Sequence, residues 1–272
     1  MNNISVLQLK NSDIPILNTI KPTEWPSIEE IHTHYLSTNC CNCIKVINDN
    51  NEILGIGTGI SFNQTGWLAH IIVSKNHQRK GIGSIIVQDR IKYFTESCNC
   101  KTITLTATDQ GHPVYKRLGF VEESMYVTMI RTTENTNDQK ISDNIIKAKP
   151  EHYEEMLKLD FITSGENRED LLKPIFCNKY VYLKNNNIQG FYLPNFGDSG
   201  VTAITEEAGI ALLGEKIKKD KWISFPEENI EAYNFLLNNG YKEINRFHRM
   251  IYGNSFKHNP HYCYSRIGGF AG

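Results

Sequence analysis

HQRKGIGS, residues 77–84, is the stretch that decides the fold of the first half of this sequence. It follows the apolar run WLAHIIV (67–73), and it precedes IIVQDRIKYF (85–94), whose apolar residues recur at helical spacing. The pattern predicts a strand that passes into a helix through a short loop. That loop holds two glycines and the two cations Arg79 and Lys80.

The chemistry of this loop suits a phosphate group. Backbone N–H groups at the N-terminus of a helix are unpaired and carry a positive partial charge. Gly81 and Gly83 would let a ligand approach the backbone without a Cβ in the way, and Arg79 and Lys80 add positive charge. The loop is not a P-loop, because the GK[ST] ending is missing, and it is not a dinucleotide fingerprint, because Ile86 stands where the third glycine is needed.

Composition limits the function classes. The chain has 272 residues, which suits two modest domains. Hydrophobic residues make up 40% and charged residues 22%, which is typical of a soluble globular protein. The formal net charge is −1, so no global field would attract nucleic acid or an anionic membrane. An anionic ligand must therefore be held by a local site.

Localisation and metal content are predicted from what the sequence lacks. No apolar stretch approaches the roughly 18–20 residues that a membrane span needs, and residues 1–15 do not resemble a signal peptide. The seven cysteines are an odd number, which favours reduced thiols in the cytoplasm. Cys40 and Cys43 have C-x-x-C spacing, but no matching second pair follows, so we expect no structural metal.

Hydrophobic periodicity predicts an α/β chain with a mixed sheet. The order strand, two helices, hairpin, strand, glycine loop, helix, strand, helix, strand fills residues 4–131. The polar segment 133–144 predicts a linker. A similar order returns in 145–272, which indicates duplication of one α/β unit. We therefore expect tandem domains over 1–132 and 145–272, each a central twisted sheet flanked by helices.

The sequence resembles the GNAT superfamily of N-acetyltransferases. QRKGIG (78–83) fits the family motif (Q/R)-x-x-G-x-(G/A), and YKRLGF (115–120) matches its Y-x-x-x-G-F ending. The whole chain is similar to bacterial proteins in which a GNAT domain precedes a second, GNAT-like domain. These share a T-x-x-G-x-P-V-Y run, matched here by Thr108, Gly111, Pro113, Val114 and Tyr115.

The resemblance implies where acetyl-CoA binds. In the family, the fourth strand splays from its neighbour, and its backbone holds the pantetheine and the acetyl carbonyl. The residues of this chain in that position are Ile71, Ile72 and Val73. The pyrophosphate would lie on the loop residues Gln78, Arg79, Lys80, Gly81, Ile82, Gly83 and Ser84.

The resemblance also implies catalytic and acceptor-binding residues. Tyr115 stands where family members place a general acid, and a phenol with a pKa near 10 stays protonated at neutral pH; alternatively, it packs a helix on the sheet. Trp67 occupies the position of the family's occasional glutamate base, which leaves His70 as the candidate base or as a structural histidine. Glu24 and Trp25 lie where the family lines its acceptor pocket, although Trp25 could equally cover the core.

The second half lacks the glycine loop. Glu206 and Glu207 stand where cations would be needed, so an anionic ligand would be repelled there. A degenerate domain that shapes the acceptor pocket or a dimer is the preferred interpretation. The tail 264–272 either adds a last strand or closes its glycines over a ligand.

The predicted function is acetyl-CoA-dependent transfer of an acetyl group to the amine of a small molecule or amino-acid derivative. The alternative is a catalytically silent acetyl-CoA-binding sensor or regulatory protein. We expect a small-molecule amine as partner, and neither nucleic acid nor a membrane. Nucleic-acid binding would need a basic aromatic face, and the near-zero net charge argues against it. The sequence leaves open whether the chain forms a homodimer.

Overall fold

The computed structural model describes residues 4–133 and 142–272. The chain forms two compact units, one of Met1–Val121 with Met250–Ser255, the other of Glu122–Arg249 with Phe256–Gly272. This division differs from the expected boundary at residue 132, because strand β6 (Val121–Arg131) pairs with strand β11 (Trp222–Pro226) of the second half. Residues 134–141 of the predicted linker lie outside the described residues.

The first unit is built on a mixed sheet, in which β1 to β5 lie side by side in chain order. Neighbouring strands are antiparallel except for β4 and β5, which are parallel because the helix α3 connects them. The strands are β1 (Ile4–Gln8), β2 (Cys41–Asn48), β3 (Ile53–Phe62), β4 (Thr65–Val73) and β5 (Thr102–Ala107).

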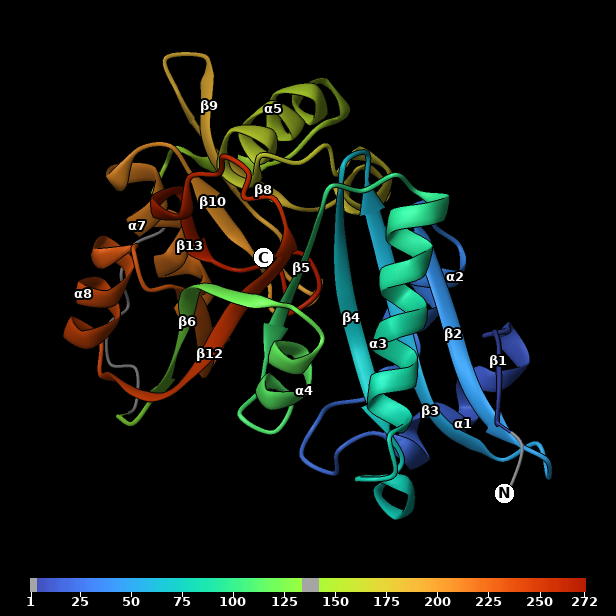
Figure 1. Cartoon of the computed structure of the whole chain (residues 1–272). Helices are drawn as coiled ribbons and strands as arrows, with labels where there is room; N and C mark the ends of the chain where they lie inside the picture. The colour runs from blue at the N-terminus through green and yellow to red at the C-terminus, as the bar shows by residue number, and fades with distance from the viewer. Residues whose placement is uncertain (1–3, 134–141) are drawn as a thin grey trace. The chain divides into compact units, whose positions relative to one another are not determined.

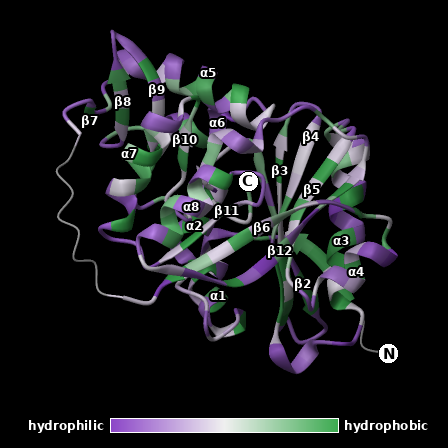
Figure 2. Cartoon of the chain, turned by 90° about the vertical axis from the view of Figure 1, so that its left-hand side faces the viewer, coloured by the Kyte–Doolittle hydropathy of each residue, from purple (hydrophilic) through white to green (hydrophobic). Residues whose placement is uncertain are grey.

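Helices cover both faces of this sheet (Figure 1). Ile82 and Ile86 of α3 pack on Ile44 and Val46 of β2, and Figure 1 shows α3 running across one face, with α1 and α2 behind it. The strands β2 to β5 carry mainly white and green segments in Figure 2, as expected for a sheet that is covered on both sides. The helices are α1 (Ile14–Ile20), α2 (Glu29–Leu36), α3 (Ile82–Lys92) and α4 (His112–Arg117).

The second unit contains a separate five-stranded sheet, in the order β13, β10, β9, β8, β7. Its core gathers Ala208, Leu212 and Leu213 of α7 around Phe225 of β11. The strands of this sheet are β7 (Ile145–Lys147), β8 (Tyr180–Lys184), β9 (Asn187–Tyr192), β10 (Val201–Ala203) and β13 (Cys263–Ser265). Strand β12 (Tyr241–Gly253) is not part of it. The helices are α5 (Tyr153–Ser164), α6 (Glu169–Leu172), α7 (Glu206–Ile217) and α8 (Ile230–Asn238).

The mixed α/β class expected from the sequence is confirmed. That the second unit is a copy of the first stays a prediction. No helix among the described residues has the length and hydropathy that crossing a membrane would require. All seven cysteines lie in described residues, and none forms a disulfide.

The C-terminal tail belongs to the core of the second unit. β13 pairs with β10, so the tail adds a strand. This was one of the two alternatives expected from the sequence. Ile267, Phe270 and Ala271 are buried. Arg168, which is 4% exposed, donates to the carbonyl of Ala271 and forms two hydrogen bonds of 2.8 and 2.5 Å to the carboxylate of Asp160, which is 1% exposed.

Removing one partner of this buried ion pair should be costly. Arg168→Met leaves the Asp160 carboxylate buried without its cation, which typically costs about 3–5 kcal/mol of unfolding free energy. Urea unfolding measures the loss. The matched control is Lys173→Met, which breaks an exposed ion pair with Glu169 and should change stability little. Equal stability of the two variants would contradict this account of the core.

Candidate functional site

Strands β4 and β5 part at their carboxyl ends. Their parallel pairing runs from Thr65 opposite Thr102 to Leu68 opposite Leu105, and β4 continues for five more residues, 69–73. On its other side β4 stays paired to β3 as far as Val73 opposite Gly55. The backbone of the last β4 residues on the β5 side is therefore outside the ladder between these two strands. Backbone N–H and C=O groups in such a position need other partners.

A β-bulge lies in β4 where the strands part. Ala69 is opposite Thr58 and Ile72 is opposite Ile56, so His70 and Ile71 together face the single residue Gly57. His70 adopts a φ of +47°, which is unusual for a residue with a large side chain. A Cβ on Gly57 would come within 2.3 Å of Ile86 Cγ2, so this glycine lets α3 lie close to the bulge.

The loop after β4 leads into α3 through two residues with positive φ, Arg79 at +60° and Gly81 at +84°. Gly81 is the N-cap of α3, and no side chain caps the helix. The first hydrogen bond of the helix runs from the N–H of Ile85 to the carbonyl of Gly81 at 3.1 Å. The three preceding N–H groups, those of residues 82–84, therefore remain for a ligand.

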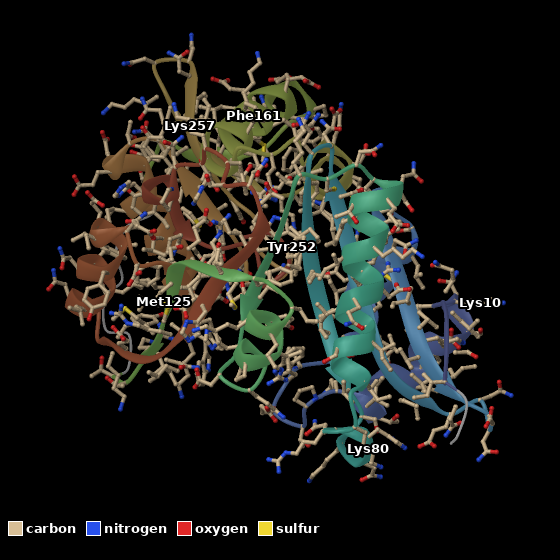
Figure 3. All side chains as sticks on the ribbon, viewed as in Figure 1. Lys10, Lys80, Met125, Phe161, Tyr252 and Lys257 are labelled. Atoms are coloured by element: carbon tan, nitrogen blue, oxygen red, sulfur yellow. The ribbon has the colours of Figure 1, made fainter. Side chains whose placement is uncertain are left out.

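Space and charge at this helix start both favour an anion. A Cβ added to Gly81 would meet no atom within 4 Å, and one added to Gly83 would meet only Val73 Cγ2, at 3.7 Å. Arg79 and Lys80 are exposed beside the helix start, and Figure 3 labels Lys80 there. A phosphate group fits this combination of N–H donors, cations and open backbone.

Gln78 is exposed, and its side chain makes two hydrogen bonds that hold the loop. Its side-chain amide donates to the carbonyl of Val73 at 3.3 Å and accepts from the amide of Gln110 at 3.4 Å. The Gln78 side chain thus joins the end of β4 to the loop before α4. Gln110 was not predicted as a site residue, because nothing in its local sequence points to this contact.

Tyr115 is part of the buried core of the first unit. It belongs to the same buried cluster as Leu68 and Leu105, the last paired residues of the two strands. Its ring meets Phe120 edge-on at 5.9 Å, and a Cβ on Gly111 would approach it to 2.9 Å. Burial raises the pKa of the Tyr115 phenol, so the hydroxyl stays protonated at neutral pH.

His70 is surrounded by aromatic rings. Its ring centroid lies 6.1 Å from that of Trp25, 5.6 Å from Tyr35 and 5.0 Å from His32. The Tyr35 hydroxyl is 3.3 Å from His70 Nδ1. The sequence predicted His70 and Trp25, and the structure brings these two together; Glu24 is exposed in the same loop as Trp25.

His32 and Tyr35 were missed from the sequence. They lie three residues apart on α2, a spacing that places both on one helix face, and this periodicity was the available signal. Both are fully buried. Their contact with His70 depends on how α2 packs on the sheet, which periodicity alone does not determine.

Burial keeps both histidines uncharged. It lowers the pKa of His70 to about 3, with a further lowering from His32, and it also lowers the pKa of His32. His32 Nδ1 lies 2.7 Å from the carbonyl of Ile28, which can only accept, so Nδ1 carries the proton. Both rings are therefore neutral at physiological pH.

The start of α7 in the second unit differs from that of α3. The side chain of Thr205 accepts from the N–H of Ala208, and so caps α7. Glu207 accepts hydrogen bonds from Tyr182 at 2.6 Å and Lys184 at 2.5 Å. A Cβ on Gly209 would come within 2.1 Å of the Tyr264 ring. The open, uncapped helix start of the first unit therefore has no counterpart at α7.

Two solved structures have a similar fold. The crystal structure of a protein from Pyrococcus horikoshii, named as a putative acetyltransferase, superposes with a TM-score of 0.84 at 19% identity, over 99% of this chain and 96% of that one. The GCN5-related glucosamine N-acetyltransferase region of a fungal multi-domain GH3 β-N-acetylglucosaminidase gives a TM-score of 0.66 at 14% identity, over 93% of this chain and 38% of that one. These likenesses concern the fold.

The sequence comparison finds a family likeness in the first part of the chain. No curated protein matches the sequence. The model of the acetyltransferase (GNAT) family matches residues 11–120, which contain the bulged strand, the uncapped helix start and Tyr115. The likeness to the acetyltransferase (GNAT) family therefore lies in residues 11–120.

Proposed function

We propose that the protein is an N-acetyltransferase that moves the acetyl group of acetyl-CoA to the amine of a small molecule or amino-acid derivative. The observation that carries this proposal is the placement, within one unit, of an uncapped helix start directly after a strand that parts from its neighbour. A helix start of this kind suits a pyrophosphate, and an unpaired strand edge suits the amide groups of pantetheine.

The residues proposed to hold acetyl-CoA fall into two groups. Ile71, Ile72 and Val73 would offer their backbone to the pantetheine and the acetyl carbonyl. The N–H groups of Ile82, Gly83 and Ser84 would bind the pyrophosphate, with Arg79 and Lys80 beside them. Gln78 and Gly81 would keep the loop in this shape, Gln78 through its hydrogen bond to Val73 and Gly81 through its positive φ.

Tyr115 and His70 are proposed to handle the protons of the reaction. The amine nitrogen attacks the thioester carbonyl, the carbon–sulfur bond breaks, and the thiolate of CoA takes a proton. Tyr115 keeps its proton at neutral pH and would donate it to that thiolate. His70 is uncharged, and it is the proposed acceptor of the proton that the amine loses.

Transfer is distinguished from a purely sensory role by one measurement. An acetyltransferase releases the free thiol of CoA at a rate that depends on an added amine, whereas a sensor binds acetyl-CoA without such release. Purified protein would be mixed with acetyl-CoA and a panel of amines, and the thiol would be followed by its absorbance with a disulfide reagent. Binding of acetyl-CoA without amine-dependent thiol release from any member of a broad panel would contradict the proposal.

The phosphate role of the helix start is tested at Gly83. Gly83→Glu should abolish CoA binding, because a carboxylate would stand against the pyrophosphate. The position is partly exposed, and a Cβ there makes only an ordinary contact at 3.7 Å, so the protein should remain folded. Gly83→Ala adds the Cβ without the charge, and should bind CoA far better than the glutamate variant in calorimetry. Unchanged CoA affinity in a folded Gly83→Glu protein would show that the loop is not the phosphate site.

The proton-donor role is tested at Tyr115. Tyr115→Phe removes one oxygen and keeps the ring that packs on Phe120. General acid catalysis typically contributes about 10²–10⁴-fold, so turnover should fall at least roughly tenfold while acetyl-CoA affinity changes far less. Steady-state kinetics and calorimetry measure the two quantities. Full turnover in this variant would return Tyr115 to a packing role.

The low pKa of His70 has a consequence for stability. The unfolded chain takes up a proton on this imidazole near pH 6.5, but the folded protein does so only near pH 3. The unfolding free energy should therefore fall as the pH is lowered from 6.5 towards 3. His70→Asn, which tolerates the positive φ, should lose stability less steeply over this range in urea unfolding at several pH values. Equal slopes for the two proteins would mean that His70 is not neutral in the folded state.

A further inference from the structure

Four rings meet at the bulge of β4 and are called the ring cluster here: Trp25, His32, Tyr35 and His70. His32 and Tyr35 are 0% exposed, whereas Trp25 and His70 are half-buried. The two half-buried members meet edge-on, with an interplanar angle of 82°. A ligand can therefore reach Trp25 and His70, while His32 and Tyr35 form the buried backing behind His70.

The ring cluster carries no charge at neutral pH. Burial lowers the pKa of both histidines, and the other two members are neutral aromatic residues. A second feature is an unused acceptor: His32 Nε2 is buried and has no hydrogen-bond partner among the described residues. Uncharged rings favour an apolar or aromatic group, and a cation is attracted to the faces of aromatic rings.

The loop that carries Trp25 is fixed in place by α1. The ammonium of Lys21 donates to the carbonyl of Trp25 at 2.5 Å and to that of Pro22 at 3.2 Å. The Asn18 side chain accepts from the N–H of Ile28 at 3.1 Å and donates to Ser27 at 3.0 Å. Trp25 is thus held on both sides of its loop. Lys21 is used to hold this loop, which leaves it poorly placed to bind the carboxylate of a ligand.

From these contacts we propose that the ring cluster binds the acceptor as a primary amine attached to an aromatic ring or a comparable apolar group. The ring of the acceptor would lie against Trp25, and its amine would point towards His70. His70 precedes Ile71 in the bulge, and Ile71 is the first of the residues proposed to hold the acetyl group, so the amine would arrive beside the thioester. This inference rests on the proposed function and names the acceptor class of that same site.

The first experiment compares amines that differ in one property. Acetyl-CoA thiol release is measured with 2-phenylethylamine and tryptamine as aromatic amines, against spermine as a polycation, glucosamine as a polar amine and glutamate as an amino acid with an anionic side chain. We expect kcat/KM for the aromatic amines to exceed that for the other three by at least about tenfold. Spermine, glucosamine or glutamate turned over as efficiently as 2-phenylethylamine would overturn the inference and leave the proposed function intact.

The second experiment assigns the preference to Trp25. Trp25→Ala should raise KM for 2-phenylethylamine about tenfold, and Trp25→Phe, which keeps an aromatic ring, should restore most of the loss. The control is Trp222→Ala, which removes a 57% exposed tryptophan from the second unit and should leave KM unchanged. An equal KM in Trp25→Ala and the unmodified protein would show that the aromatic group binds elsewhere.

A binding measurement separates the proposed acetyl transfer from the proposed amine site at the ring cluster. The indole N–H signals of the three tryptophans are assigned by NMR from the Trp25→Phe and Trp222→Ala variants, and 2-phenylethylamine is titrated in the presence of CoA. A shift of the Trp25 signal with no thiol release supports the ring cluster as an amine site and refutes acetyl transfer. No shift of that signal at saturating 2-phenylethylamine refutes the inference, whatever the protein does with other amines.

Discussion

Beyond Leu68 and Leu105, β4 and β5 share no ladder pairs, and the first unit is organised around this parting. Backbone N–H and C=O groups need hydrogen-bond partners, and the proposed partners at this strand edge are the amide groups of pantetheine. β4 stays paired to β3 on both sides of the bulge at His70 and Ile71, and a bulge of this kind bends the strand that carries it. Gly57 makes the bulge compatible with α3, because no side chain stands between them.

The recognition of acetyl-CoA that we propose for this site depends more on backbone than on side chains. The start of α3 is uncapped, has two glycines without close neighbours, and lies at the end of the strand that parts. The start of α7 has a threonine cap, acidic residues and a glycine covered by Tyr264. The two helix starts differ in side-chain chemistry and in the space around them, and both differences favour an anion only at α3.

In the second unit, a buried charged group connects the core to the end of the chain. Arg168 connects Asp160 to the carbonyl of Ala271, so the tail is held by a cation inside the core. Tyr264 covers Gly209, and Asn229 caps α8 while its amide donates to the carbonyl of Cys263 at 3.1 Å. The glycines of the tail therefore lie within a packed region, which agrees with a structural role for residues 264–272.

The sequence by itself determined the order of the elements, the glycine loop and the position of Tyr115. These features can be predicted because hydrophobic periodicity, glycine spacing and short motifs are local properties of the chain. The sequence also named His70 and Trp25 as candidates, although not that their rings meet. Tertiary structure alone decided the contribution of His32 and Tyr35, the bulge at His70, the role of Gln110 and the pairing of β6 with β11. These features join residues far apart in the chain, and their geometry and burial arise only when helices pack on a sheet. The low pKa of His70 has the same origin, because desolvation is a property of the packed core and not of the residue.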